Sequence, residues 1–242
     1  MSKLVVFSGL GTIVLGGLFL SVLLRPEPRL ENPLINLDKN KDPLHSAVLE
    51  KEAPVLTGEI KNDISGRFIL RGTAFIPKES SVKIKDSIIF AERDSKIEVL
   101  GEANIINSTF SSNQIHPTRK YWHGLVVSDG GKISADKVTI KDAAAGITCS
   151  GKSRMIINNS TLENNVVGIV AMPAQLCQMK DSTISQGRVG VQVLGGFPLI
   201  DNVKFSLLYD GLRIYKGEPK IFKLEFDRIE REQIWKPVQK PM

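Results

Sequence analysis

Apolar and polar positions alternate along most of this chain, and the alternation repeats at a nearly constant interval. One apolar position recurs about every 22 residues, with a single longer interval. Its occupants are Ile89, Phe110, Ile140, Leu162, Ile184, Phe205 and Phe226. A two-residue alternation rich in Val, Ile, Thr and Asn indicates strands rather than paired amphipathic helices. Each repeat therefore predicts one coil of a solenoid built from strands.

Four repeats align over their whole length, from residue 132 to residue 219. Each contains a strand, a polar turn, a second strand, a corner marked by glycine and a third strand. The glycines are Gly146, Gly168, Gly190 and Gly211. Parallel pairing of coils would stack equivalent inward residues. One predicted column is Cys149, Ala171, Val193 and Ile214, and another is Ile140, Leu162, Ile184 and Phe205. This pattern predicts a three-sided parallel β-helix.

The coils before and inside the repeats carry further motifs. Val82-Lys83-Ile84 precedes Ile97-Glu98-Val99-Leu100-Gly101, and Trp122, Gly124 and Leu125 form an aromatic-x-Gly-Leu coil. These motifs resemble the right-handed parallel β-helix proteins of the pectate-lyase-like superfamily. The resemblance implies an all-β, right-handed, single-stranded parallel β-helix of about seven coils. It says little about function, because this superfamily holds lyases, hydrolases, epimerases, adhesins and inert scaffolds.

The resemblance covers residues 58–227, and an apolar stretch precedes it. Residues 4–24 carry no charge and are long enough to cross a hydrocarbon core of ~30 Å. We predict a single-pass transmembrane anchor in residues 1–25. The alternative is a cleaved signal peptide, although its apolar core is usually only about 7–15 residues long. Because β-helices of this kind are commonly exported, we expect the β-helix on the periplasmic or extracellular side of the membrane.

Small residues and termini complete the predicted organisation. Ser8, Thr12 and Gly16 recur every four residues in the anchor, a spacing that lets two membrane helices approach closely. The alternative is that such residues are simply frequent in membrane helices. Residues 26–57 are predicted to be a linker with a possible N-terminal cap, and residues 228–242 a C-terminal cap or tail.

Charge narrows the range of partners. The chain has a formal net charge of +6 and a pI of about 9.3. Its lysines and arginines are scattered among acidic residues, and it lacks a nucleic-acid-binding motif, so no nucleic-acid partner is expected. An acidic polysaccharide or an anionic lipid is the more plausible electrostatic partner.

Two cysteines are present. Cys149 lies in the first predicted column, and Cys177 aligns with the apolar residues Met155 and Ile133. This alignment places the cysteines on different strands of coils that are not neighbours. A disulfide requires Cα atoms within about 7 Å, so two buried free thiols are expected.

The segment between Phe110 and Gly124 is about eight residues longer than the corners of the other coils. It is the candidate binding site, because loops on rigid scaffolds often carry binding residues. Its candidate binding residues are His116, Arg119, Lys120, Tyr121, Trp122 and His123. Aromatic and cationic groups suit a sugar ring that bears carboxylates. The alternative is that Trp122 packs over the coil and the segment is a bulge.

Catalysis on this fold would need clustered acids. Two carboxylates about 5–9.5 Å apart serve a glycosidase, and grouped Asp and Glu hold Ca²⁺ in lyases. The sequence instead aligns acids with amides: Asp136, Asn158 or Asn159, Asp181, and Asp201 or Asn202. This column favours a hydrogen-bond ladder at a corner, with an acidic site as the alternative. We therefore predict no catalytic residue, metal site or cofactor.

The functional hypothesis is a membrane-anchored, non-enzymatic scaffold or interaction module. It would belong to a cell-envelope assembly and have a protein partner. The alternative is an envelope protein that binds or cleaves an acidic polysaccharide.

Overall fold

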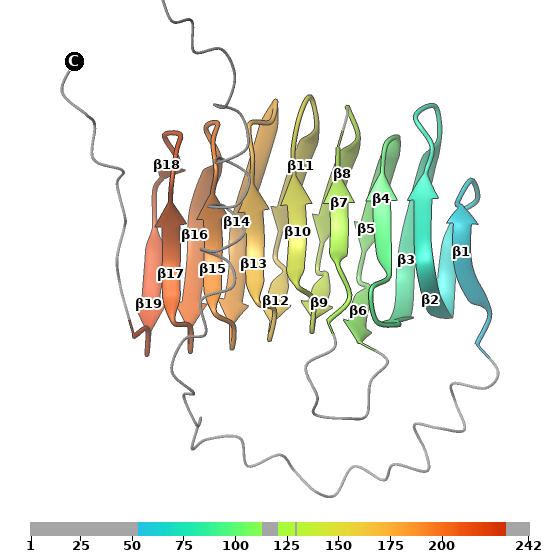
Figure 1. Ribbon diagram of the computed structural model, residues 1–242, viewed down its shortest axis with the longest axis horizontal. Coiled ribbons are helices and arrows are strands. Elements are labelled where there is room, and N and C mark those ends of the chain that lie inside the picture. The colour runs from blue at the N-terminus through green and yellow to red at the C-terminus, as the bar shows by residue number, and fades with distance from the viewer. Residues whose placement is uncertain (1–52, 113–120, 129, 231–242) are drawn as a thin grey trace, which may run out of the picture. The chain divides into compact units, whose positions relative to one another are not determined.

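The computed structural model describes residues 53–112, 121–128 and 130–230, which wind into a parallel β-helix (Figure 1). The strands are β1 (Val55–Glu59), β2 (Ile64–Ile76), β3 (Ser81–Ala91), β4 (Lys96–Val99), β5 (Glu102–Ile106), β6 (Thr109–Ser112), β7 (Gly124–Val127), β8 (Lys132–Asp136), β9 (Thr139–Lys141), β10 (Ala145–Cys149), β11 (Arg154–Asn158), β12 (Thr161–Glu163), β13 (Val167–Ala171), β14 (Leu176–Ser185), β15 (Val189–Val193), β16 (Leu199–Ser206), β17 (Asp210–Ile214), β18 (Lys220–Ile221) and β19 (Leu224–Asp227). All pairings between these strands are parallel, which confirms the predicted class of fold.

The solenoid has three faces. Face 1 contains β5, β8, β11 and β18 with the first halves of β3, β14 and β16. Face 2 contains β6, β9, β12 and β19 with the second halves of the same long strands. Face 3 contains β4, β7, β10, β13, β15 and β17, the front row of arrows in Figure 1. Each coil thus passes through faces 1, 2 and 3 in turn.

Both predicted columns are confirmed by the strand register. On face 3, Cys149 is followed by Ala171, Val193 and Ile214 on successive rungs. On face 2, the column is Ile89, Phe110, Ile140, Leu162, Ile184, Phe205 and Phe226. From Ile89 to Phe205 the side chains of that column are at most 1% exposed, and the rings of Phe205 and Phe226 stack with centroids 5.5 Å apart.

The repeated glycines have a different role from the predicted one, because they lie inside strands of face 3 rather than at corners. A Cβ on Gly190 would lie 2.4 Å from the carbonyl oxygen of Gly211 and 2.5 Å from the ring of Phe205. Glycine is therefore required where the next coil and the core approach closely. Other residues in the left-handed backbone region turn the corner between faces 1 and 2: Asp86, Asn107, Lys137, Asn159, Asp181 and Asn202.

The termini extend beyond the described strands. Strand β1 already begins at Val55, inside the predicted linker, and β19 ends at Asp227. Ile229 packs against the core near the C-terminal end. The predicted anchor, with Ser8, Thr12 and Gly16, lies outside the described residues. Within residues 53–112, 121–128 and 130–230, no helix is long and apolar enough to span a bilayer.

The two cysteines are free and buried, as predicted. Cys177 stands in register with Met155, which also confirms the alignment. Cys149 ends β10 and Cys177 lies near the start of β14, so they are on different strands of coils that are not neighbours, as predicted. The structure adds that both lie at one corner, because the Cys149 sulfur is 3.5 Å from the carbonyl oxygen of Leu176. Alignment of the coils alone did not indicate this proximity.

Candidate interaction surfaces

The insertion leaves β6 on face 2 and returns to β7 on face 3. Of its six candidate binding residues, His116, Arg119 and Lys120 lie outside the described residues. Tyr121, Trp122 and His123 are described, and they form the end of the insertion that joins the solenoid.

Trp122 belongs to the core and not to an exposed binding surface, which corrects the prediction for this residue. Its side chain is 0% exposed. Its ring stacks on Phe110, with centroids 6.3 Å apart and planes 15° apart. The indole Nε1–H donates a hydrogen bond of 2.8 Å to the carbonyl oxygen of Lys141. The backbone bridges to Ala143 in the next coil, so Trp122 occupies the inward position at this corner.

Tyr121 is half-buried and His123 is exposed. The backbone fixes both positions, because the carbonyl of Tyr121 accepts from the N–H of Asp94 at 3.4 Å and the N–H of His123 donates to Ser95 at 2.7 Å. These two side chains are therefore the described members of the predicted site that remain accessible to a ligand.

A carboxylate lies at the same corner in the following coil. Burial raises the pKa of Asp142, while hydrogen bonds from the Asn164 amide and the Ser112 backbone N–H act in the opposite direction. The Asn164 amide is 2.6 Å from the Asp142 carboxylate. With these partners, Asp142 serves as an acceptor that ties neighbouring coils together.

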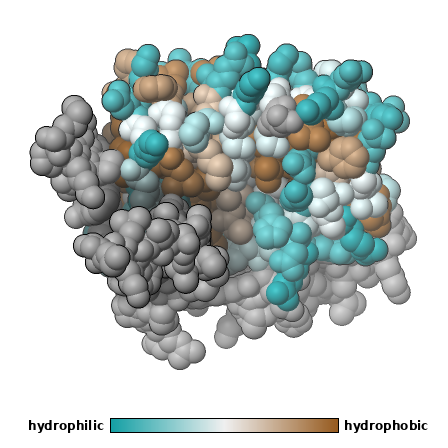
Figure 2. All heavy atoms as spheres, turned by 45° about the horizontal axis from the view of Figure 1, so that its top comes forward, coloured by the Kyte–Doolittle hydropathy of each residue, from teal (hydrophilic) through white to brown (hydrophobic). Residues whose placement is uncertain are grey.

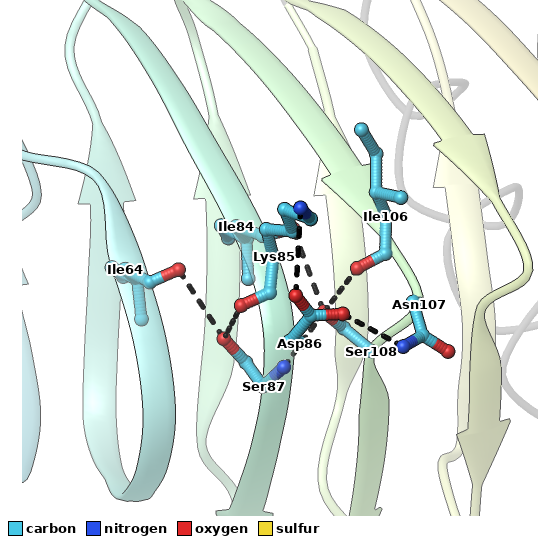
Figure 3. Close-up of polar contacts among 8 residues, drawn as sticks. All are labelled: Ile64, Ile84, Lys85, Asp86, Ser87, Ile106, Asn107 and Ser108. Atoms are coloured by element: carbon cyan, nitrogen blue, oxygen red, sulfur yellow. Dashed lines mark hydrogen bonds and ion pairs between the residues drawn. The ribbon is translucent and has the colours of Figure 1, made fainter.

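The aligned acids and amides form rungs of a hydrogen-bond ladder, as predicted. The amide of Asn159 donates to Asp136 at 2.7 Å, and that of Asn202 donates to Asp181 at 2.6 Å. Figure 3 shows the equivalent pair of Asn107 and Asp86, 2.7 Å apart. These Asp side chains are engaged in cross-coil hydrogen bonds, and within the described residues no three His, Cys, Asp or Glu side chains are grouped to hold a metal ion.

A second ladder lies just inside the first, made of the buried residues Ser87, Ser108, Ser160 and Ser182. The backbone N–H of Ser87 donates to the hydroxyl of Ser108 at 3.1 Å (Figure 3). The N–H of Ser160 likewise donates to Ser182 at 3.0 Å. Buried polar groups must be paired. The hydroxyls of Ser108, Ser160 and Ser182 each accept a backbone N–H from the preceding coil, and the hydroxyl of Ser87 donates to backbone carbonyls. This corner is therefore a structural seam.

Sequence reasoning missed an apolar surface on the last coils. Phe197, before β16, is 68% exposed, and Phe222, after β18, is 71% exposed. Tyr215, after β17, is 38% exposed. We call these three aromatic residues, with the exposed Lys216, Lys220 and Lys223, the C-terminal aromatic surface. One signal in the sequence could have revealed this surface. Because side chains alternate between inward and outward along a strand, the inward Ile221 implies that Phe222 points outward.

The position of this surface follows from the pairing of the last two rungs. Glu218 N–H donates to Gly196, and Phe222 N–H donates to Ile200, at 2.9 and 3.1 Å. The two phenylalanines therefore flank face 1 at its C-terminal end, one at each corner. Figure 2 brings the corner between faces 3 and 1 forward and shows hydrophobic side chains among hydrophilic ones, including some toward the C-terminal coils.

A shallow hollow lies at the same corner nearer the N-terminus. Its volume is about 180 Å³ and its lining includes Lys78, Glu79, Leu100, Glu102 and Lys132. Glu102 and Lys132 form an ion pair of 3.7 Å with more than half of each side chain exposed. Such an exposed ion pair contributes little to the free energy of folding, and it does not provide a buried acid for catalysis.

Comparison with known proteins gives one match. A family model described as a right-handed β-helix region matches residues 60–230. No curated protein and no solved structure matches the chain.

Proposed function

The chain belongs to the family with a right-handed β-helix region, and we propose that it is a membrane-anchored scaffold or interaction module of a cell-envelope assembly. In this proposal, the apolar N-terminal stretch holds the chain in the membrane. The β-helix lies on the exported side, where a protein partner docks on its outer surface.

The C-terminal aromatic surface is the observation that carries this proposal. Two phenylalanines about 70% exposed flank one face of a solenoid whose interior is already filled. Burying a side chain of this size against a partner contributes about 1.5–3 kcal/mol. Aromatic residues are common energetic centres of interfaces, and lysines at the rim favour an acidic partner patch.

The test is a double substitution, Phe197→Ser with Phe222→Ser. Both side chains point outward, so we expect the fold to persist and partner capture to weaken by about 2 kcal/mol or more. The measurement is affinity capture from detergent-solubilised native membranes with quantitative mass spectrometry. Leu207→Asn is the matched control, because Leu207 is exposed at another corner with φ of 52°, which Asn tolerates. Wild-type capture by the double variant would refute this surface as the docking site.

The alternative function is binding or cleavage of an acidic polysaccharide at the insertion. The exposed His123 and half-buried Tyr121 favour it, together with the sequence neighbours Arg119 and Lys120. Arg119→Ala with Tyr121→Ala, added to the same capture experiment, separates the two functions and leaves the core residue Trp122 in place. Loss of polysaccharide retention in this variant alone would favour the alternative. Release of new polysaccharide chain ends by the wild-type protein would show cleavage.

A further prediction concerns the anchor. We expect the full chain to remain with membranes after carbonate extraction, because 21 uncharged residues would span the hydrocarbon core. We also expect the mature N-terminus to lie near Met1 and the β-helix to be reached by protease added from the exported side. Deletion of residues 4–24 is the control and should release the chain. Soluble protein that starts after residue 24 would instead show a cleaved signal peptide.

A further inference from the structure

Two buried cysteines lie at the corner between faces 3 and 1 of the solenoid. Cys149 ends β10, and Cys177 is the second residue of β14. The Cys149 sulfur lies 3.5 Å from the carbonyl oxygen of Leu176, the residue before Cys177. The Cys149 sulfur also lies 3.4 Å from the Ser153 hydroxyl, at the same corner. The two cysteines play no part in the proposed docking of a partner.

The fold explains why residues so distant in sequence meet. On the rung after Cys149 stands Ala171, whose side chain is a single methyl group. The chain then turns the corner and reaches Cys177, on the rung after Met155. The small residue leaves room for the Cys149 sulfur beside the start of β14, so both cysteines lie at the same corner.

We propose that Cys149 and Cys177 are the site of an intramolecular disulfide that staples non-adjacent coils of the solenoid. The co-reactant is a disulfide-bearing thiol oxidant, either a protein or a small molecule. One cysteine thiolate attacks the oxidant and releases one thiol, and the second cysteine then displaces the other thiol from the mixed disulfide. Two S–H bonds and one S–S bond break, while one new S–S bond and two S–H bonds form.

The directions of the two pKa shifts indicate which cysteine attacks the oxidant first. Hydrogen bonds from Cys177 and Ser153 lower the pKa of Cys149, against the effect of burial. The hydrogen bond with Cys149, burial and the neighbouring negative charge all raise the pKa of Cys177 well above its usual value. Cys149 is therefore the better nucleophile of the pair. Both side chains are at most 6% exposed in the folded chain, so the reaction with the oxidant takes place during folding.

The bond would close a loop of about 28 residues and restrict the unfolded chain. Oxidation should therefore raise Tm by roughly 5–10 °C for a domain of this size. The pair itself can be tested with a supplied oxidant. Only the natural source of the oxidant rests on the proposed function, because an exported domain would fold in an oxidising compartment.

The experiment refolds the full chain in detergent with either oxidised glutathione or dithiothreitol, then quenches, alkylates and digests it. We expect a Cys149–Cys177 linked peptide from most of the oxidised chain, and a higher Tm than in the reduced sample. Cys149→Ser with Cys177→Ser should show no dependence of Tm on redox conditions. Two alkylated cysteines, a bond between two chains, or a linked chain with lowered Tm would overturn the proposal.

A second arm alkylates the chain in its native membranes before extraction. A linked peptide there supports both the disulfide site and the proposed export. Free thiols in native membranes, combined with efficient bond formation during refolding, would support the disulfide site and contradict export.

Discussion

Leu162→Asp should unfold the solenoid or leave it barely stable. Leu162 is 1% exposed and lies between Ile140 and Ile184 in the column on face 2. Removing a buried Leu side chain typically costs about 2–5 kcal/mol, and an unpaired carboxylate adds several kcal/mol for its loss of water. Since domains are generally stable by only about 5–15 kcal/mol, the loss approaches the whole free energy of unfolding.

The measurement is thermal and urea unfolding of the full chain in detergent, followed by circular dichroism. Thr161→Asp is the matched control, because Thr161 is the adjacent residue on β12 and points outward between Thr139 and Thr183. We expect this control to lose about 1 kcal/mol or less. A stable Leu162→Asp variant would mean that the register of face 2 is wrong.

The column on face 2 could be predicted because two independent sequence patterns indicate it. Every coil repeats the inward position, and each inward residue has polar or outward-facing neighbours, so the period and the alternation support the same register. The same redundancy predicted the ladder of Asn159 on Asp136. It could not decide between Asn158 and Asn159, because that choice depends on which residue takes the left-handed conformation at the corner.

Features that depend on contacts across corners were not predictable in this way. Cys149 and Cys177 lie in different columns, and only the path of the turn places the Cys149 sulfur beside the start of β14. The glycine role was misread for a similar reason, since the repeat shows that Gly190 is required but not that the ring of Phe205 excludes a Cβ. The exposed Phe197 follows an irregular Gly-Gly turn, where the alternation of apolar and polar residues no longer indicates which way a side chain points.

Trp122 shows the effect of an insertion on sequence reasoning. The segment before Trp122 departs from the period. Counting from Phe110 therefore could not show whether the Trp122 side chain points into the core or toward solvent. Its type and its neighbours suggested a ligand contact, while its place in an aromatic-x-Gly-Leu coil left packing as the alternative. The structure supports packing, because the ring lies on Phe110 inside the core.

Trp122→Ala should therefore reduce stability strongly. Truncating a buried Trp costs about 3–5 kcal/mol through lost contacts and the cavity that remains. The carbonyl of Lys141 would also lose its indole donor, which adds about 1–3 kcal/mol if no water replaces it. Trp122→Phe keeps a ring against Phe110 but loses that donor, so we expect an intermediate loss of about 1–3 kcal/mol.

Stability and capture, measured on the same variants, separate core packing from ligand contact. If Trp122 acts only through packing, Trp122→Phe should lower Tm and leave capture of partner or polysaccharide unchanged at a temperature where the variant is folded. A Trp235→Phe background isolates the emission of Trp122, since the chain has two tryptophans. That emission should be blue-shifted and poorly quenched by acrylamide. Wild-type Tm with lost capture, or an emission readily quenched, would return Trp122 to the binding surface.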